Sequence, residues 1–134
     1  MPKFSENSLK LLRNAHPDLQ VIMNEAIKHI DFTAICTYRN QADQDQAYSE
    51  GRSKLKYPKS KHNQKPSLAV DIAFYYPTPP HIRYDDPKTA SYLAGYIMMI
   101  AKTMNINLRW GGDFNMNNIA SDQDFFDSAH FELI

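Results

Sequence analysis

Apolar side chains recur along the chain with two different periods, and each period predicts a type of secondary structure. From Pro17 to Ile30 they fall at three- and four-residue intervals, which indicates an amphipathic helix with Pro17 in its first turn. A longer apolar stripe follows Asp86-Pro87 and continues to Met104. This second segment predicts the strongest helix of the chain and the central piece of its core.

Two further helices are predicted from polar and capping residues. The segment from Gln41 to Glu50 follows Asn40, a favourable N-cap, and stops at Gly51. Its glutamines, Gln44 among them, are expected on the solvated side of this helix. Near the N-terminus, Ser8 is a candidate cap for a short helix.

Strands are predicted for four segments rich in β-branched and aromatic residues, which are Phe32 to Tyr38, Leu68 to Tyr75, Ile106 to Trp110 and His130 to Ile134. The basic stretch from Arg52 to Lys65 is expected to be an exposed loop. Together the elements predict the α+β class, with helices packed on one face of a small, mostly antiparallel sheet.

Length and charge restrict what the chain can be. Its 134 residues are a usual size for one domain, so we expect a single domain over residues 1–134 and a monomer. Fifteen Lys and Arg residues balance fifteen Asp and Glu residues, which argues against a nucleic-acid partner. The apolar run from Tyr96 to Ala101 is far shorter than the roughly 20 residues of a membrane-spanning helix, so no membrane insertion is expected.

The single cysteine, Cys36, excludes an internal disulfide and a cysteine-rich metal site. It lies between Ile35 and Thr37 in an apolar segment, where a buried, inert thiol is the commoner outcome. A cysteine hydrolase is therefore disfavoured. The N-terminal residues contain no apolar core of the kind that a secretory signal carries, so we expect synthesis and retention in a cytoplasm.

The candidate chemistry lies in His62, Asp71 and the segment from Asp127 to His130. Two histidines and a carboxylate form a ligand set that a catalytic zinc uses, which leaves the fourth tetrahedral position for water. Asp71 lies within a predicted strand, where aspartate is disfavoured, so it needs a partner. If the strands of Asp71 and His130 are neighbours, alternation places both side chains on one face and adds Glu132 to it.

Each of these residues also has an ordinary structural interpretation. His62 alone is typical of a solvated loop histidine among lysines, and His130 alone is typical of a satisfied core histidine. Arg39, at the end of a predicted strand, is either a surface charge or a guanidinium clamp for a carboxylate or an oxyanion. The combination of these residues favours a metal-dependent hydrolase.

The motifs Ser60-x-His62, Ala69-Val70-Asp71 and Asp127-x-x-His130-x-Glu132 resemble the zinc peptidases of the D-Ala-D-Ala carboxypeptidase and L-alanyl-D-glutamate endopeptidase family. This family shares its fold with the hedgehog signalling domain, and the chain looks most like the short bacteriophage endolysins. One departure is the eight residues between His62 and Asp71, which exceed the usual spacing.

The resemblance implies a role for each candidate residue, and with them one zinc ion as cofactor. The zinc ligands would be His62, Asp71 and His130. Asp127 would be the general base, and Arg39 would stabilise the substrate or the transition state. Ser60 would support the site from its loop, and Glu132 would orient a ligand histidine.

The resemblance also implies a peptidoglycan peptidase whose partner is the stem peptide. An L-alanyl-D-glutamate endopeptidase is favoured, acting as a phage endolysin that leaves the host cytoplasm through a membrane lesion or pore and degrades the cell wall. A D-Ala-D-Ala carboxypeptidase or dipeptidase is one alternative, because its substrate also carries a D residue with a free carboxylate after the scissile bond. A non-catalytic, zinc-stabilised binding module is the other, and the retention of Asp127 argues against it.

Overall fold

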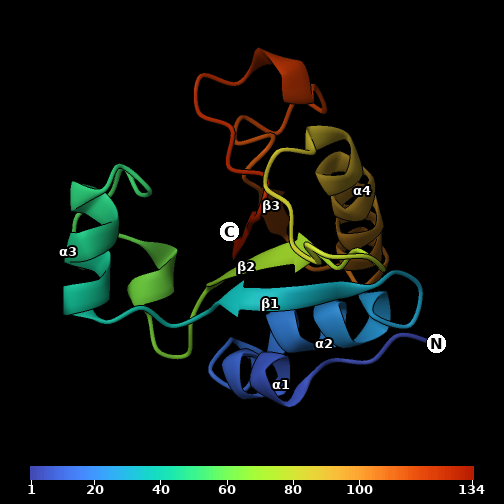
Figure 1. The fold of residues 1–134 in the computed structure, drawn as a ribbon. Helices are drawn as coiled ribbons and strands as arrows, with labels where there is room; N and C mark the ends of the chain where they lie inside the picture. Colours follow the sequence, from blue (N-terminus) through green and yellow to red (C-terminus); the bar gives the residue numbers. More distant parts are fainter.

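A four-stranded sheet organises the chain in the computed structural model, which describes residues 1–134 (Figure 1). Its strands are β1 (Phe32–Cys36), β2 (Ala69–Phe74), β3 (Leu108–Trp110) and β4 (His130–Leu133). They lie in the order β1-β2-β4-β3, and every neighbouring pair is antiparallel. The predicted α+β class with a small antiparallel sheet is confirmed, although the strands are shorter than the predicted segments.

The helices of the structure are α1 (Glu6–Leu12), α2 (Pro17–Ala26), α3 (Gln41–Ser49) and α4 (Pro87–Thr103), with short 3-10 turns η1 (Lys61–Asn63) and η2 (Ala120–Asp122). Both α2 and α4 begin with a proline, as predicted, because proline has no N–H to leave unpaired in the first turn. None of these helices combines the length and the apolar character needed to cross a membrane.

Capping residues set where the helices begin. Asn40 caps α3, as predicted. The predicted cap of α1 is wrong, because the hydroxyl of Ser5 accepts the N–H of Ser8 at 3.1 Å and the helix begins earlier. Ser8 instead lies fully buried within α1, where its hydroxyl accepts the N–H of Ala34 at 3.1 Å. That hydrogen bond joins α1 to β1.

The core lies between the sheet and the helices α1, α2 and α4. Buried apolar side chains of these helices meet Val70 and Ile72 of β2 and Phe131 of β4. Figure 1 shows α3 standing away from this layer, beside the sheet. The buried residues of α3, Gln44 and Ala47, accordingly do not belong to the core cluster.

The register of β2 against β4 decides which side chains face away from the core. Asp71 lies directly opposite His130 in this antiparallel pair. Because the neighbouring Val70, Ile72 and Phe131 belong to the core, Asp71 and His130 project together from the other face of the sheet. The fold therefore gathers polar side chains on that face.

Candidate active site

A cleft of about 650 Å³ lies over the polar face of the sheet. Two loops contribute to its lining, the segment 51–55 that follows α3 and the aromatic stretch that carries Phe114, Phe125 and Phe126. The site residues expected from the sequence all line this cleft, namely Arg39, Ser60, His62, Asp71, Asp127, His130 and Glu132. The fold thus brings together groups that lie far apart along the chain.

His62 is held deep in the cleft rather than on an exposed loop. It lies in η1, which Ser60 caps by accepting the N–H of His62 at 3.2 Å, and the residue is only 2% exposed. Its Nδ1 donates to the carbonyl of Thr37 at 2.6 Å, which turns Nε2 toward Asp71 at 3.2 Å. The predicted exposed loop from Arg52 to Lys65 is therefore wrong for η1, where His62 and Asn63 are buried.

The long segment between His62 and Asp71 is anchored by Ser67. This residue is fully buried, and its hydroxyl lies at hydrogen-bond distance from two carbonyl acceptors, that of Thr37 at 2.9 Å and that of Ala69 at 2.7 Å. Its N–H donates to the carbonyl of Asn14 at 2.8 Å. The long segment is thus tied back to the start of β2, two residues before Asp71.

His130 is oriented from its outer side by Glu132. The Nε2 of His130 lies 2.8 Å from Oε1 of Glu132, and the other oxygen of that carboxylate accepts from Nη2 of Arg109 at 2.8 Å. The Nδ1 of His130 therefore faces inward, 3.1 Å from Oδ1 of Asp71. A carboxylate that fixes the ring in this way is the usual companion of a metal-binding histidine.

The arrangement fits a metal ion. One nitrogen of each histidine is already held by Thr37 or Glu132, and the remaining nitrogens, Nε2 of His62 and Nδ1 of His130, both meet Oδ1 of Asp71. A tetrahedral zinc with bonds of about 2.0–2.1 Å keeps its ligand atoms roughly 3.3 Å apart. The two histidine-to-Asp71 separations, 3.2 Å for His62 and 3.1 Å for His130, are close to that value. Two imidazoles and a carboxylate are also the donor types that zinc prefers.

Without a metal ion, the ionisation of Asp71, His62 and His130 is strongly coupled. Burial opposes ionisation of Asp71, but hydrogen bonds from His130 and His62 outweigh it and hold its pKa far below the usual range. Burial likewise opposes protonation of His62, whose bond to Asp71 raises its pKa to about 10. For His130, bonds to Asp71 and Glu132 overcome burial and raise the pKa to about 9. Two positive charges surround the carboxylate, and a divalent cation can replace the protons that carry them.

Cys36 lies nearer to this centre than the sequence predicts. It is half-buried, and its Sγ lies 3.9 Å from Nδ1 of His62 and from Nη2 of Arg39. Ligand atoms of Cys36, His62 and Asp71 all lie within 4.8 Å of one another, so these three residues form a possible metal grouping that the sequence analysis did not anticipate. His130 contacts Asp71 from the other side, and the nitrogen of His62 nearest the thiol is bonded to Thr37.

Asp127 is placed by the backbone around Gly111. The N–H of Gly111 donates to the carbonyl of His130 at 2.6 Å, and the N–H of Asp127 donates to the carbonyl of Gly111 at 2.9 Å. Burial, together with the negative charge of Asp71, raises the pKa of Asp127. A carboxylate with a raised pKa is a stronger proton acceptor, and this one lines the same cleft as the two histidines.

Gln44 is a site residue that the sequence prediction placed wrongly. It is fully buried, and its amide oxygen accepts from Nη1 of Arg39 at 2.9 Å. Its amide nitrogen donates to Oγ of Ser53 at 2.9 Å and to the carbonyl of Leu55 at 2.7 Å. The polar pattern of α3 predicted a solvated position for Gln44. Instead its side chain bonds to Arg39, to Asn63 and to the loop that follows α3.

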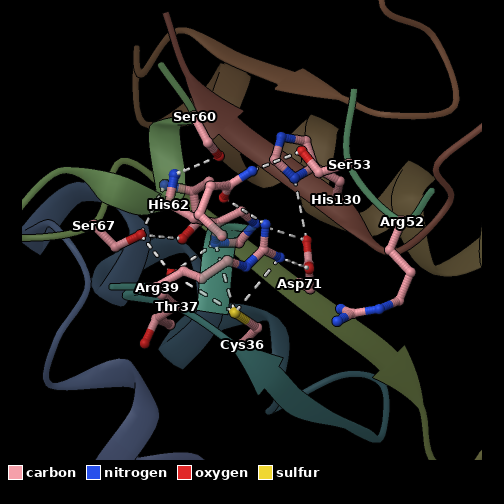
Figure 2. A network of polar contacts seen from close by, with 12 residues as sticks. Cys36, Thr37, Arg39, Arg52, Ser53, Ser60, His62, Ser67, Asp71 and His130 are labelled. Atoms are coloured by element: carbon pink, nitrogen blue, oxygen red, sulfur yellow. Dashed lines mark hydrogen bonds and ion pairs between the residues drawn. The ribbon is translucent and has the colours of Figure 1, made fainter. Parts of the chain in front are cut away.

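Arg39 reaches from the end of β1 into the centre of the site. Figure 2 shows its guanidinium directed at Asp71 and Cys36. The distance from Nη2 to Oδ2 of Asp71 is 3.7 Å, and the arginine side chain is 12% exposed. A guanidinium fixed by Gln44 in this way can hold a carboxylate or a developing oxyanion.

The two loops of the cleft contain further residues that lie outside the sequence motifs. The ammonium of Lys54 lies 4.8 Å from the ring centre of Phe125, which joins the two loops. The ring of Phe114 lies 6.0 Å from that of His130. Basic and aromatic residues in these loops were the only sequence signal, and such residues are common in exposed loops without any function.

The chain is similar to known peptidases over nearly its whole length. A family model described as phage L-alanyl-D-glutamate peptidase matches residues 1–134. The L-alanyl-D-glutamate peptidase of Escherichia phage T5 is 31% identical over 138 residues, with 98% of both chains covered. The solved structure of the Serratia marcescens L-Ala D-Glu endopeptidase ChiX matches with a TM-score of 0.77 at 21% identity. That match covers 98% of this chain and 90% of the Serratia chain, and it shows the same fold.

Proposed function

Because the chain belongs to the phage L-alanyl-D-glutamate peptidase family, we propose that it is a zinc-dependent endopeptidase that cuts the L-Ala–D-Glu bond of peptidoglycan stem peptides. One observation carries the proposal. The inward nitrogens of His62 and His130 meet at a single oxygen of Asp71, within a cleft that Asp127 and Arg39 also line. Metal ligands, a proton acceptor and a cation are thus available in one place.

His62, Asp71 and His130 would hold the zinc. When bound, the ion supplies Lewis acidity that polarises the scissile carbonyl and makes water a stronger nucleophile at neutral pH. The hydrogen bonds to Thr37 and Glu132 keep the two rings in place before the metal arrives. This preorganisation reduces the cost of forming the site.

Asp127 would manage the proton of the attacking water. It accepts that proton as the oxygen bonds to the carbonyl carbon of L-Ala. It then returns a proton to the nitrogen of D-Glu as the C–N bond breaks, so the products are a carboxylate and a free amine. Its raised pKa supports both halves of this role, because a carboxylate that holds a proton more firmly is a better base and still releases it to an amine.

Arg39 would stabilise negative charge during the same reaction. Its guanidinium is held by Gln44 and lies beside Asp71, so it is fixed before substrate binds. It can hold the α-carboxylate of D-Glu or the oxyanion of the tetrahedral intermediate. In the cell, we propose that this activity degrades the host cell wall, after the enzyme leaves the cytoplasm through a membrane lesion or pore.

The test is digestion of purified peptidoglycan by the zinc-loaded protein, followed by mass spectrometry. New peptides with N-terminal D-Glu are the expected result. Released D-Ala would instead indicate a carboxypeptidase, and unchanged peptidoglycan that retains the bound protein would indicate a non-catalytic binding module.

Two aspartates of one loop provide a matched pair of variants. Asp127→Asn should retain zinc and its folded structure while losing turnover, because only the proton acceptor is removed. Asp124→Asn alters an exposed aspartate that does not line the cleft, so its activity should equal that of the wild type. Full activity in Asp127→Asn would show that another group moves the proton.

A further inference from the structure

We propose that Lys54 binds a carboxylate of the stem peptide and so determines how the substrate lies in the cleft. This inference rests on the proposed peptidase function and extends it to substrate recognition. The stem peptide is anionic beyond the scissile bond, where D-Glu retains its α-carboxylate and later residues carry further carboxylates. A cationic group with no internal partner is therefore the feature to look for in the cleft.

Four lysine and arginine side chains line the cleft, and three of them have an internal polar partner. Arg39 bonds to Gln44, Arg52 pairs with Glu50 at 3.0 Å, and Lys61 donates to a main-chain carbonyl at 2.7 Å. Lys54 makes no hydrogen bond and no ion pair. A carboxylate can therefore pair with Lys54 in addition to the anion that Arg39 holds.

The ammonium of Lys54 lies over an aromatic ring. Its distance from the ring centre of Phe125, which belongs to the opposite loop of the cleft, is 4.8 Å. Such a contact is weaker than a charge-assisted hydrogen bond to a carboxylate. A carboxylate that enters the cleft between the two loops can therefore form an ion pair with the ammonium. No stronger internal bond of Lys54 has to break.

The two residues that flank Lys54 are held by one buried side chain. Gln44 donates to Oγ of Ser53 and to the carbonyl of Leu55, the two residues that flank Lys54. The same amide accepts a hydrogen bond from Arg39. One residue thus positions Arg39 and the base of Lys54 together, which preorganises a pair of cations along the cleft.

Arg39 and Lys54 line the same cleft, and both are held through Gln44. A substrate whose leaving side carries carboxylates is attracted to these two cations. We infer that Lys54 contributes to this attraction in binding, and that it takes no part in the chemical step.

The experiment compares Lys54→Gln with Lys56→Gln in steady-state kinetics on a defined stem peptide. Lys56 is the matched control, because its ammonium also lies over a ring, that of Tyr48 at 5.2 Å, but it does not line the cleft. We expect Lys54→Gln to raise KM about fivefold to tenfold with little change in kcat, as for a partly screened ion pair. Lys54→Arg should restore KM, and Lys56→Gln should leave it unchanged.

Two amidated substrates identify the carboxylate. One carries D-isoglutamine in place of D-Glu, and the other has its carboxylates beyond that residue converted to amides. The wild type should discriminate against one of the two, and Lys54→Gln should lose that discrimination. Added salt should reduce the preference of the wild type, because exposed charges are screened.

The outcomes separate this inference from the proposed function. If the wild type does not cut the L-Ala–D-Glu bond, the proposed function fails. If the wild type cuts it and Lys54→Gln matches both Lys56→Gln and wild type on all three substrates, the role of Lys54 is refuted while the function stands. An equal loss of kcat in Lys54→Gln and Lys54→Arg, with KM unchanged, would also contradict a binding role.

Discussion

Replacing Gly111 with alanine should damage the active site although Gly111 contributes no side chain to it. Gly111 follows β3, and its backbone bonds to Asp127 and His130. A β-carbon at this position would overlap the carbonyl oxygen of Asp127 and approach the β-carbon of His130 to 3.0 Å. The atoms in the way are backbone atoms of Asp127 and the β-carbon of His130, which is attached directly to a strand, so neither can rotate aside.

The size of the effect follows from this overlap. Non-bonded heavy atoms rest about 3.5 Å or more apart, so relieving the overlap requires Asp127 or Gly111 to move by more than about 1 Å. A displacement of that size at a catalytic group costs on the order of 100-fold in rate. We therefore expect kcat/KM of Gly111→Ala to fall by about 100-fold, with weaker zinc binding because His130 shifts as well.

Gly95→Ala is the matched control for this substitution. Gly95 lies within α4, and nothing lies within 4 Å of a β-carbon built there. Alanine in place of glycine within a helix stabilises by about 0.5–1 kcal/mol, so this variant should unfold at a slightly higher temperature and keep full activity.

The assays are thermal unfolding, zinc content after dialysis and steady-state cleavage of the stem peptide. Gly111→Ala should remain folded at the assay temperature, so that lost activity reports on the site. Wild-type activity and zinc content in Gly111→Ala would refute the reasoning, because they would show that the site does not depend on the close approach of Gly111 to Asp127.

Three other predictions concern different parts of the molecule. Glu132→Gln should weaken zinc affinity by about 10- to 100-fold in competition with a chelator, since His130 loses its charged partner; unchanged affinity would contradict this role. Asp86→Asn should lower the unfolding temperature at neutral pH, because hydrogen bonds to Thr89 lower the pKa of Asp86 to about 2. The stabilisation that ionised Asp86 provides is complete above the ordinary pKa of about 4 and is lost as the pH falls through about 2. The unfolding temperatures of the wild type and Asp86→Asn should therefore converge in acid. Phe131→Ala should lower the free energy of unfolding by about 3–5 kcal/mol in urea titration, because the ring is fully buried in the core.

Much of the site could be predicted from the sequence because it depends on local rules. Alternation along a strand places Asp71 opposite to its apolar neighbours, and it places Glu132 on the same side as His130. An aspartate in mid-strand requires a partner, and a histidine in the neighbouring strand supplies it. Such inferences need only the period of a strand and the assumption that two strands are neighbours.

The interpretation of Gln44 was wrong because its partners are set by the fold. A glutamine on a polar helix is solvated unless another segment covers it, and the segment that covers Gln44 is a loop with no regular pattern. The position of Cys36 beside His62 depends in the same way on where η1 meets the end of β1. Sequence periodicity carries no information about such tertiary contacts.

The sequence by itself determined the element types, the polar face of the sheet and a set of candidate metal ligands. Only the tertiary structure decided that Nε2 of His62 and Nδ1 of His130 both face Asp71, and that Gln44 fixes Arg39 and the loop of Lys54 together. The physical reason is one of range. Periodicity and capping act over a few residues, whereas a site is made by hydrogen bonds between segments far apart in the chain, and those bonds form only when the core has packed.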